Sequence, residues 1–137
     1  MANSDVLADR LLQAVGQLSR STRTETLPPG EAAVLSYLDR DGAQSIAALA
    51  EQRGVRHQTA AKIVAQLETA GLVAKKGHPD DARMVLVSLT RKGATALKRE
   101  RASRASWLSE AIRAELSADQ RKRLPDVVAA LEALAQH

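Results

Sequence analysis

The residues best suited to chemistry in this 137-residue sequence lie on two faces of a helix expected over residues 56–70. One face is apolar, with side chains at i, i+3, i+4 and i+7, namely Ala60, Ile63, Val64 and Leu67. The opposite face is polar or small and consists of Gln58, Lys62, Ala65 and Thr69, flanked by Thr59 and Gln66. A helix that enters the major groove of DNA needs this layout, because a short or polar front lets the backbone approach the base edges. The alternative is an ordinary amphipathic helix whose outer face is only solvated.

Several of these side chains carry the groups that read or anchor duplex DNA. Gln58 is suited to a bidentate contact with adenine, Thr59 to a phosphate or a thymine methyl group, and Lys62 to a guanine or a phosphate. Arg56 and His57 precede them at the amino-terminal end of the helix, where the helix dipole favours a phosphate. These residues, with the flanking Gln66, are candidate DNA contacts.

A second set of candidate DNA contacts lies in a β-hairpin that the sequence predicts after this helix. The run at 72–75 and the β-branched run at 84–89 flank a turn at 77–81. Arg83 lies near the tip, where a guanidinium group can enter a narrow, A·T-rich minor groove. Asp81 precedes it by two residues and is expected to hold that guanidinium in position. The alternative is a surface ion pair of little energetic value.

The rest of the chain predicts the elements that must position this helix and hairpin. Apolar stripes indicate a first helix over about 4–20 and a second from Pro29 to Asp41, with a polar loop at 23–26. Ser45 is a good N-cap for a short third helix. Two helices joined by a tight turn with a glycine form a helix-turn-helix, and the hairpin that follows it would be a wing.

Two further helices are predicted after the hairpin. Thr90 caps a long helix that reaches Glu115. Residues 117–120 have the pattern of a capping box for a last helix. Pro125 is expected to kink that helix or to delay its regular start.

Composition and charge favour a mostly helical protein with an anionic partner. Hydrophobic residues make up 45% of the chain, with no Phe, one Tyr and one Trp, and small side chains suit closely packed helices. The net charge is +4, and the positive charge is concentrated in the second half, where Lys75 and Lys76 lie in the first strand of the hairpin. The absence of cysteine excludes disulfides, thiolate zinc sites and thiol-based redox sensing.

Other classes of protein find little support. His57, His78 and His137 have no metal-ligand neighbours at helical spacing, so we expect no metal site. We find neither a glycine-rich phosphate loop nor a recognisable nucleophile motif, and therefore expect no cofactor and no enzymatic activity. The polar amino-terminal residues and the lack of a long apolar run predict a soluble, cytoplasmic protein that does not enter membranes.

The stretch 72–90, LVAKKGHPDDARMVLVSLT, resembles the wing of the MarR family of transcriptional regulators. That wing typically has charged residues followed by Pro-x-Asp-x-Arg and a Val-Leu-Val-x-Leu-Thr strand. The segment from Leu27 through Leu38 resembles the second helix of the family, and the stretches 46–50 and 58–68 resemble its helix-turn-helix. The match covers residues 27–95 closely, and the flanking helices match by pattern alone.

The resemblance implies a fold, an assembly and a set of roles. The fold is mostly α with a small β-hairpin wing (α+β), a single domain of residues 1–137. Residues 27–95 form the winged helix-turn-helix lobe, and residues 1–26 and 105–137 form helices that make a homodimer. Arg83 becomes the wing-tip arginine of the minor groove and Asp81 its partner. Ala82 and Ala74 stand where members often carry charged residues, which implies fewer phosphate contacts through the wing.

In this family, small and often aromatic acids bind between the dimerisation helices and the DNA-binding lobe. Tyr37 and Trp107 are candidates to line such a pocket for an aromatic or phenolic effector; the alternative is that both are packing residues. The resulting prediction is a sequence-specific regulator of double-stranded DNA, expected to act as a repressor on a pseudo-palindromic operator. The alternative is a winged-helix protein-interaction module that does not bind DNA specifically.

Overall fold

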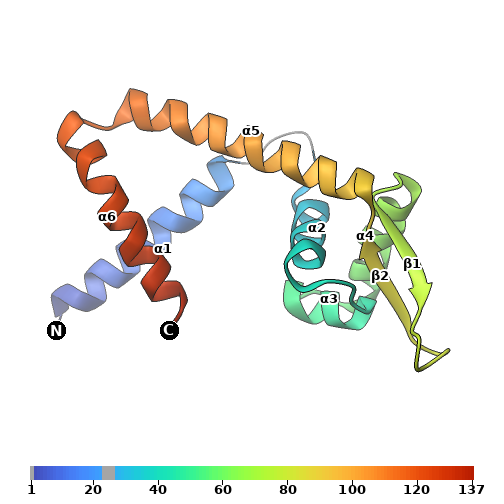
Figure 1. Ribbon diagram of the computed structural model, residues 1–137. Coiled ribbons are helices and arrows are strands. Elements are labelled where there is room, and N and C mark those ends of the chain that lie inside the picture. Colours follow the sequence, from blue (N-terminus) through green and yellow to red (C-terminus); the bar gives the residue numbers. More distant parts are fainter. Residues whose placement is uncertain (1, 23–26) are drawn as a thin grey trace.

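The computed structural model describes residues 2–22 and 27–137, so the predicted loop at 23–26 and Met1 lie outside the described residues. This described part forms six helices and one hairpin (Figure 1). The elements are α1 (Ala2–Ser21), α2 (Pro29–Asp41), α3 (Ile46–Arg53), α4 (His57–Thr69), β1 (Val73–Gly77), β2 (Val85–Leu89), α5 (Arg91–Glu115) and α6 (Ala118–Ala135). The prediction of a mostly helical protein with a hairpin wing is confirmed.

Local capping residues determine where three of the helices begin. Ser45 Oγ accepts a hydrogen bond from the backbone N–H of Ala48 at 3.1 Å, and Thr90 Oγ1 accepts one from Gly93 at 3.0 Å. At the start of α6, Ser117 and Gln120 form both hydrogen bonds of a capping box, at 2.9 and 3.2 Å. All three predicted caps are confirmed.

The last helix begins seven residues before its proline. We expected Pro125 to kink α6 or to delay its regular start, but α6 begins at Ala118 and contains Pro125 in its interior. The expectation of a delayed start is wrong. The capping box satisfies the first N–H groups, and Arg121 N–H already bonds the carbonyl of Ser117 at 3.0 Å, so the helix is established before the proline is reached.

A single hydrophobic core holds together the hairpin, the three helices before it and the start of α5. Its buried members are Val34, Leu35, Leu38, Leu49, Val64, Leu67, Leu72, Val73, Val87 and Leu97. The apolar back of α4 supplies Val64 and Leu67, and the helix packs on α2 and α3 as the i, i+3, i+4, i+7 pattern predicted. The start of α5 closes this core through Leu97.

The two strands pair antiparallel from Val73 opposite Leu89 to Gly77 opposite Val85. An isolated bridge extends this sheet to the turn before α3. Gln44 N–H donates to the carbonyl of Val87 at 3.0 Å, and Val87 N–H donates to the carbonyl of Gln44 at 2.7 Å. The hairpin is therefore fixed to the amino-terminal end of α3 by backbone hydrogen bonds rather than by side chains alone.

The terminal helices lie apart from this core. α5 extends away from the hairpin lobe, and α6 follows at its far end (Figure 1). In the same view α1 crosses α6, and its carboxyl-terminal end lies below the middle of α5. No described side chain of α1 or α6 is buried. Their exposed large hydrophobic residues are Val6, Leu7, Leu12, Val15, Leu18, Val127, Val128 and Leu134. Two helices with so much exposed apolar surface leave a face that this chain does not cover by itself.

Candidate nucleic-acid interface

The front of α4 is open along its length. All six predicted front and flanking side chains are exposed, namely Gln58, Thr59, Lys62, Ala65, Gln66 and Thr69. Ala60, Val64 and Leu67 on the back of the helix are buried in the core. Four of the front residues line a shallow depression of about 400 Å³, namely Lys62, Ala65, Gln66 and Thr69. Small Ala65 near the middle of this face leaves room for a partner to approach the helix backbone.

The amino-terminal end of α4 suits an anion. Arg56 occupies the N-cap position, and no side chain caps the first turn. The first turn also has no acidic residue, so neither a side-chain acceptor nor a negative charge competes there for its N–H groups. Arg56 and His57 are both exposed at this end. The helix dipole and these side chains together favour a phosphate group.

Arg83 lies exposed in the turn of the hairpin, as predicted, but its contact with Asp81 is different. Asp81 Oδ1 accepts a hydrogen bond from the backbone N–H of Arg83 at 2.9 Å, and within the described residues no ion pair joins this carboxylate to the guanidinium. At a spacing of two residues in a turn, the backbone N–H is the closest donor to an aspartate side chain. Asp81 therefore shapes the turn and leaves the guanidinium of Arg83 extended to solvent.

The fold brings the wing and the start of α4 to one groove. His57, Asp81 and Arg83 line a depression of about 400 Å³ together with Ser45, Ile46, Ala47, Met84 and Val85. Sequence reasoning singled out His57, Asp81 and Arg83 but did not predict that they share a surface. The pairing of Gln44 with Val87 accounts for it, because that pairing draws the hairpin against the start of α3.

The two lysines of β1 differ in their surroundings. Lys75 Nζ lies 3.6 Å from Glu68 Oε1, a solvent-exposed ion pair that links the hairpin to the end of α4. Lys76 is exposed, and the part of the chain that the structure describes gives it no carboxylate within ion-pair distance. A surface pair of this kind contributes little stability, so Lys75 can exchange Glu68 for a phosphate at small cost.

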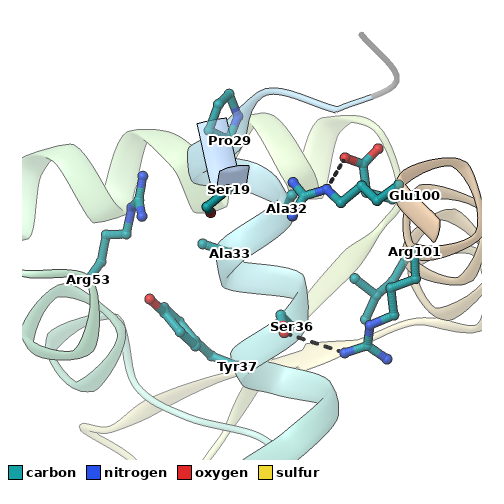
Figure 2. A pocket seen from close by; sticks show the side chains of 11 residues that line it. Ser19, Pro29, Ala32, Ala33, Ser36, Tyr37, Arg53, Glu100 and Arg101 are labelled. Atoms are coloured by element: carbon teal, nitrogen blue, oxygen red, sulfur yellow. Dashed lines mark hydrogen bonds and ion pairs between the residues drawn. The ribbon is translucent and has the colours of Figure 1, made fainter. Parts of the chain in front are cut away.

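A separate cavity of about 350 Å³ lies between α2 and α5 and also contacts the ends of α1 and α3 (Figure 2). Small residues of α2 line it, with Tyr37 at one end, and three arginines from two other helices surround it, namely Arg53, Arg101 and Arg104. Trp107 is not among the lining residues, and its side chain is 41% exposed. Of the two candidate pocket residues, Tyr37 lines this cavity and Trp107 does not.

Two of the three arginines of this cavity are held by hydrogen bonds, namely Arg101 and Arg104. Arg101 Nη1 lies 3.0 Å from Asp39 Oδ2, and its Nη2 lies 3.4 Å from Ser36 Oγ. Arg104 Nε donates to Glu100 Oε1 at 3.1 Å, and Glu100 is only 1% exposed (Figure 2). The sequence did not single out Arg101 and Arg104, because α5 is the third helix after α2 and neither arginine belongs to a local motif.

The pKa shifts that the structure produces lie at the end of α2, outside the candidate interface. The guanidinium of Arg40 hydrogen-bonds the Asp41 carboxylate, which lowers the pKa of Asp41 and raises the pKa of Arg40. Arg40 also lies over the ring of Tyr37, 5.6 Å from its centroid. Both charged groups are exposed, so this pair gives little pH-dependent stability.

Neither a metal site nor a membrane span is found within the described ranges, 2–22 and 27–137. No group of three or more His, Asp or Glu side chains there could hold a metal ion. No helix in the same ranges is both long and apolar enough to cross a bilayer.

Comparison with known proteins identifies the family of this arrangement. Residues 25–84 match the model of the MarR family. An HTH-type transcriptional regulator from Mycobacterium bovis is 36% identical over 115 residues, 80% of each chain. The crystal structure of a transcriptional regulator from Pseudomonas aeruginosa is 30% identical and superposes with a TM-score of 0.83 over 100% of this chain and 99% of that one. The PcaV transcriptional regulator from Streptomyces coelicolor, solved in complex with its natural ligand, is 28% identical with a TM-score of 0.59, over 94% and 91% of the two chains. The chain therefore belongs to the MarR family of winged helix-turn-helix, DNA-binding transcriptional regulators.

Proposed function

We propose that this regulator binds a specific double-stranded operator and represses transcription from it. The observation that carries the proposal is the exposed polar front of α4 together with the exposed wing-tip guanidinium, which lies in one groove with the start of that helix. α4 would enter the major groove through Gln58, Thr59 and Lys62, and Arg83 would enter the adjacent minor groove. A regulator that covers promoter DNA in this way blocks polymerase access, which makes repression the expected outcome.

The second candidate function is a winged-helix module that binds a protein partner and has no operator. Lys62 distinguishes the two functions, because it is exposed on the front of α4 and, within the described residues, makes no hydrogen bond or ion pair that a substitution would disturb. Lys62→Ala should weaken binding to a genomic fragment selected by the wild type about tenfold, the value of one good base or phosphate contact. Fluorescence anisotropy with labelled fragments measures this. An unchanged affinity would favour the interaction module.

We infer that the chain acts as a homodimer through residues 1–26 and 105–137, with residues 27–95 as the DNA-binding lobe. The exposed apolar residues of α1 and α6 support this, since no described part of the same chain buries them. The described part of the interface excludes Met1 and residues 23–26. Two lobes related by a two-fold axis would present their recognition helices to half-sites about 34 Å apart on a pseudo-palindrome.

Val128 on α6 offers a test of the dimer. Val128→Glu would bring an unpaired charge into the interface and should raise the dimer dissociation constant at least about tenfold. Sedimentation equilibrium measures it. Met84→Glu is the matched control, because Met84 on the hairpin is 43% exposed and Val128 is 44% exposed. The dimer model is contradicted if both variants associate as the wild type does, or if the wild type is itself monomeric at micromolar concentration.

The cavity beside Tyr37 supports a small acidic effector. Its volume of about 350 Å³ suits a single-ring ligand, and Arg53 in its lining offers a guanidinium group to a carboxylate. Arg101 and Arg104 would have to exchange their present carboxylate partners for the ligand. PcaV, a relative of this chain, has been solved with its natural ligand. We expect benzoate, salicylate or 4-hydroxybenzoate to release the selected DNA fragment at millimolar concentration. Fragment affinity that is unchanged by all three acids would count against an aromatic acid as effector.

A further inference from the structure

The proposed recognition helix, α4, ends in a tight turn that is held by backbone hydrogen bonds. Gly71 has a φ of +77°, a left-handed conformation that favours glycine. Gly71 N–H donates to the carbonyl of Glu68 at 2.9 Å, and Leu72 N–H donates to the carbonyl of Leu67 at 2.9 Å. These are the two hydrogen bonds of a Schellman motif. The motif satisfies carbonyls inside the last turn of α4 but leaves those of residues 70–72 without a partner from the turn itself.

The start of α5 supplies a donor to each of these three consecutive carbonyls. Lys92 Nζ donates to Ala70 O at 2.9 Å, Thr90 Oγ1 to Gly71 O at 2.7 Å, and Thr90 N–H to Leu72 O at 3.1 Å. We call residues 90–92 with these carbonyls the helix clamp. Of its three hydrogen bonds, the one from Lys92 alone carries a full charge, and it acts on a carbonyl at the negative end of the helix dipole.

Lys92 thus differs from the other exposed basic residues of α5. Its ammonium group is directed at the backbone beside α4, whereas neighbouring Arg91 and Lys98 are exposed and have no ion pair in the described part of the chain. In the sequence Lys92 is one of the basic residues that make the second half of the chain positive. Its hydrogen bond to the carbonyl of Ala70 indicates a structural role at the end of α4.

We propose that Lys92 is a positioning residue for DNA recognition: it fixes the carboxyl-terminal end of α4 to α5 and so sets the angle at which α4 meets the bases. The inference rests on the proposed DNA binding. α4 has 13 residues, and its amino-terminal half carries Gln58, Thr59 and Lys62. A tilt at the anchored end therefore displaces these side chains from the base edges while the charge of the surface stays almost the same.

The test compares Lys92→Met with Lys98→Met, which removes the same charge from an exposed site that has no hydrogen bond or ion pair in the described part of the chain. Binding of a selected genomic fragment and of random DNA is measured across a salt series. We expect Lys92→Met to lower affinity for the selected fragment about three- to tenfold, the effect of a partly exposed charge-assisted hydrogen bond. Affinity for random DNA and the slope of log affinity against log salt should match those of Lys98→Met. Lys92→Arg, which keeps a charged donor, should restore most of the preference for the selected fragment.

Other outcomes overturn the proposal. If Lys92 bound a phosphate, Lys92→Met alone would reduce the salt slope by about 0.9 and would weaken selected and random DNA equally. If the clamp only stabilised the fold, the melting temperature would fall while the ratio of selected to random affinity stayed constant. If the wild type selects no fragment, the proposed function itself fails. A wild type that does select, with a Lys92→Met variant that binds identically, refutes the positioning role alone.

Discussion

Gly93→Ala is expected to destabilise the DNA-binding lobe by about 3 kcal/mol or more, a large part of the total stability of a domain this size. Gly93 is buried in the first turn of α5, where it packs on the residue that ends the α4–β1 turn. A Cβ atom at this position would overlap the carbonyl oxygen of Leu72 and lie 3.0 Å from its carbonyl carbon and 2.8 Å from Leu89 Cδ1. The overlap is with backbone, so only a displacement of α5 from the turn can relieve it. The helix clamp should therefore weaken in this variant.

Gly77→Ala is the matched control for this prediction. Gly77 ends β1, and a Cβ atom built on it meets nothing within 4 Å. The same substitution there should change the free energy of unfolding by about 0.5 kcal/mol or less. Urea unfolding followed by circular dichroism measures both variants. Equal stability of the two would show that α5 can move away from Leu72 at no cost, and the close packing inferred at Gly93 would be mistaken.

Arg83→Ala should weaken binding to a selected fragment about 10- to 100-fold, corresponding to about 1–3 kcal/mol for the loss of a specific groove contact. The guanidinium is exposed and Asp81 is engaged by the backbone of the turn, so a contact with DNA would not require this side chain to break an ion pair within the described residues. A narrow A·T-rich minor groove concentrates negative potential. Most of the loss should therefore fall on fragments with A·T pairs where the wing contacts the duplex.

Arg91→Ala is the control for the wing, because it removes the same charge from the exposed first residue of α5. It should lower the affinity for all fragments by a similar small factor and leave the A·T preference unchanged. Anisotropy titrations on two fragments that differ only at the wing contact separate the two effects. If Arg83→Ala and Arg91→Ala behave alike on both fragments, the wing does not read the minor groove.

Much of the fold could be predicted from the sequence because its signals are local. The caps at Ser45, Thr90 and Ser117 each depend on a residue within three positions, and each is present as expected. The burial of Val64 and Leu67 follows from helical periodicity, which reports one face at a time. Helix caps and helical periodicity can both be recognised without knowledge of any tertiary contact.

What the sequence did not predict depends on distant contacts or on competing donors. Asp81 bonds the backbone N–H of Arg83 and not its guanidinium. Both donors belong to one residue, so the spacing alone did not decide between them, although an aspartate in a turn commonly accepts from the N–H two residues on. The role of Gly93 could not be predicted either. From the sequence it is only a weak helix former in the first turn of a helix, and its importance depends on the close approach of the Leu72 backbone. Lys92 is another such case, since its carbonyl partner lies 22 residues earlier.

The cavity shows the same limit. Tyr37 was singled out as an aromatic residue, but Arg53 comes from α3 and Arg101 from α5, and only packing brings them to one space. Trp107 was grouped with Tyr37 because both are aromatic, yet it lies on α5 beyond Arg104, the last residue of that helix in the lining. Residue type alone does not establish which side chains share a cavity.

Sequence-specific operator binding is tested most directly by selecting fragments from the source genome with the wild-type protein. The best fragment is then titrated with salt. We expect a pseudo-palindromic fragment with half-sites about one turn of DNA apart, bound at least about 1,000-fold more tightly than random DNA. Its log affinity should fall linearly with log salt by about 0.9 per phosphate contact. If no fragment binds better than random DNA at physiological salt, sequence-specific operator binding by this chain is contradicted.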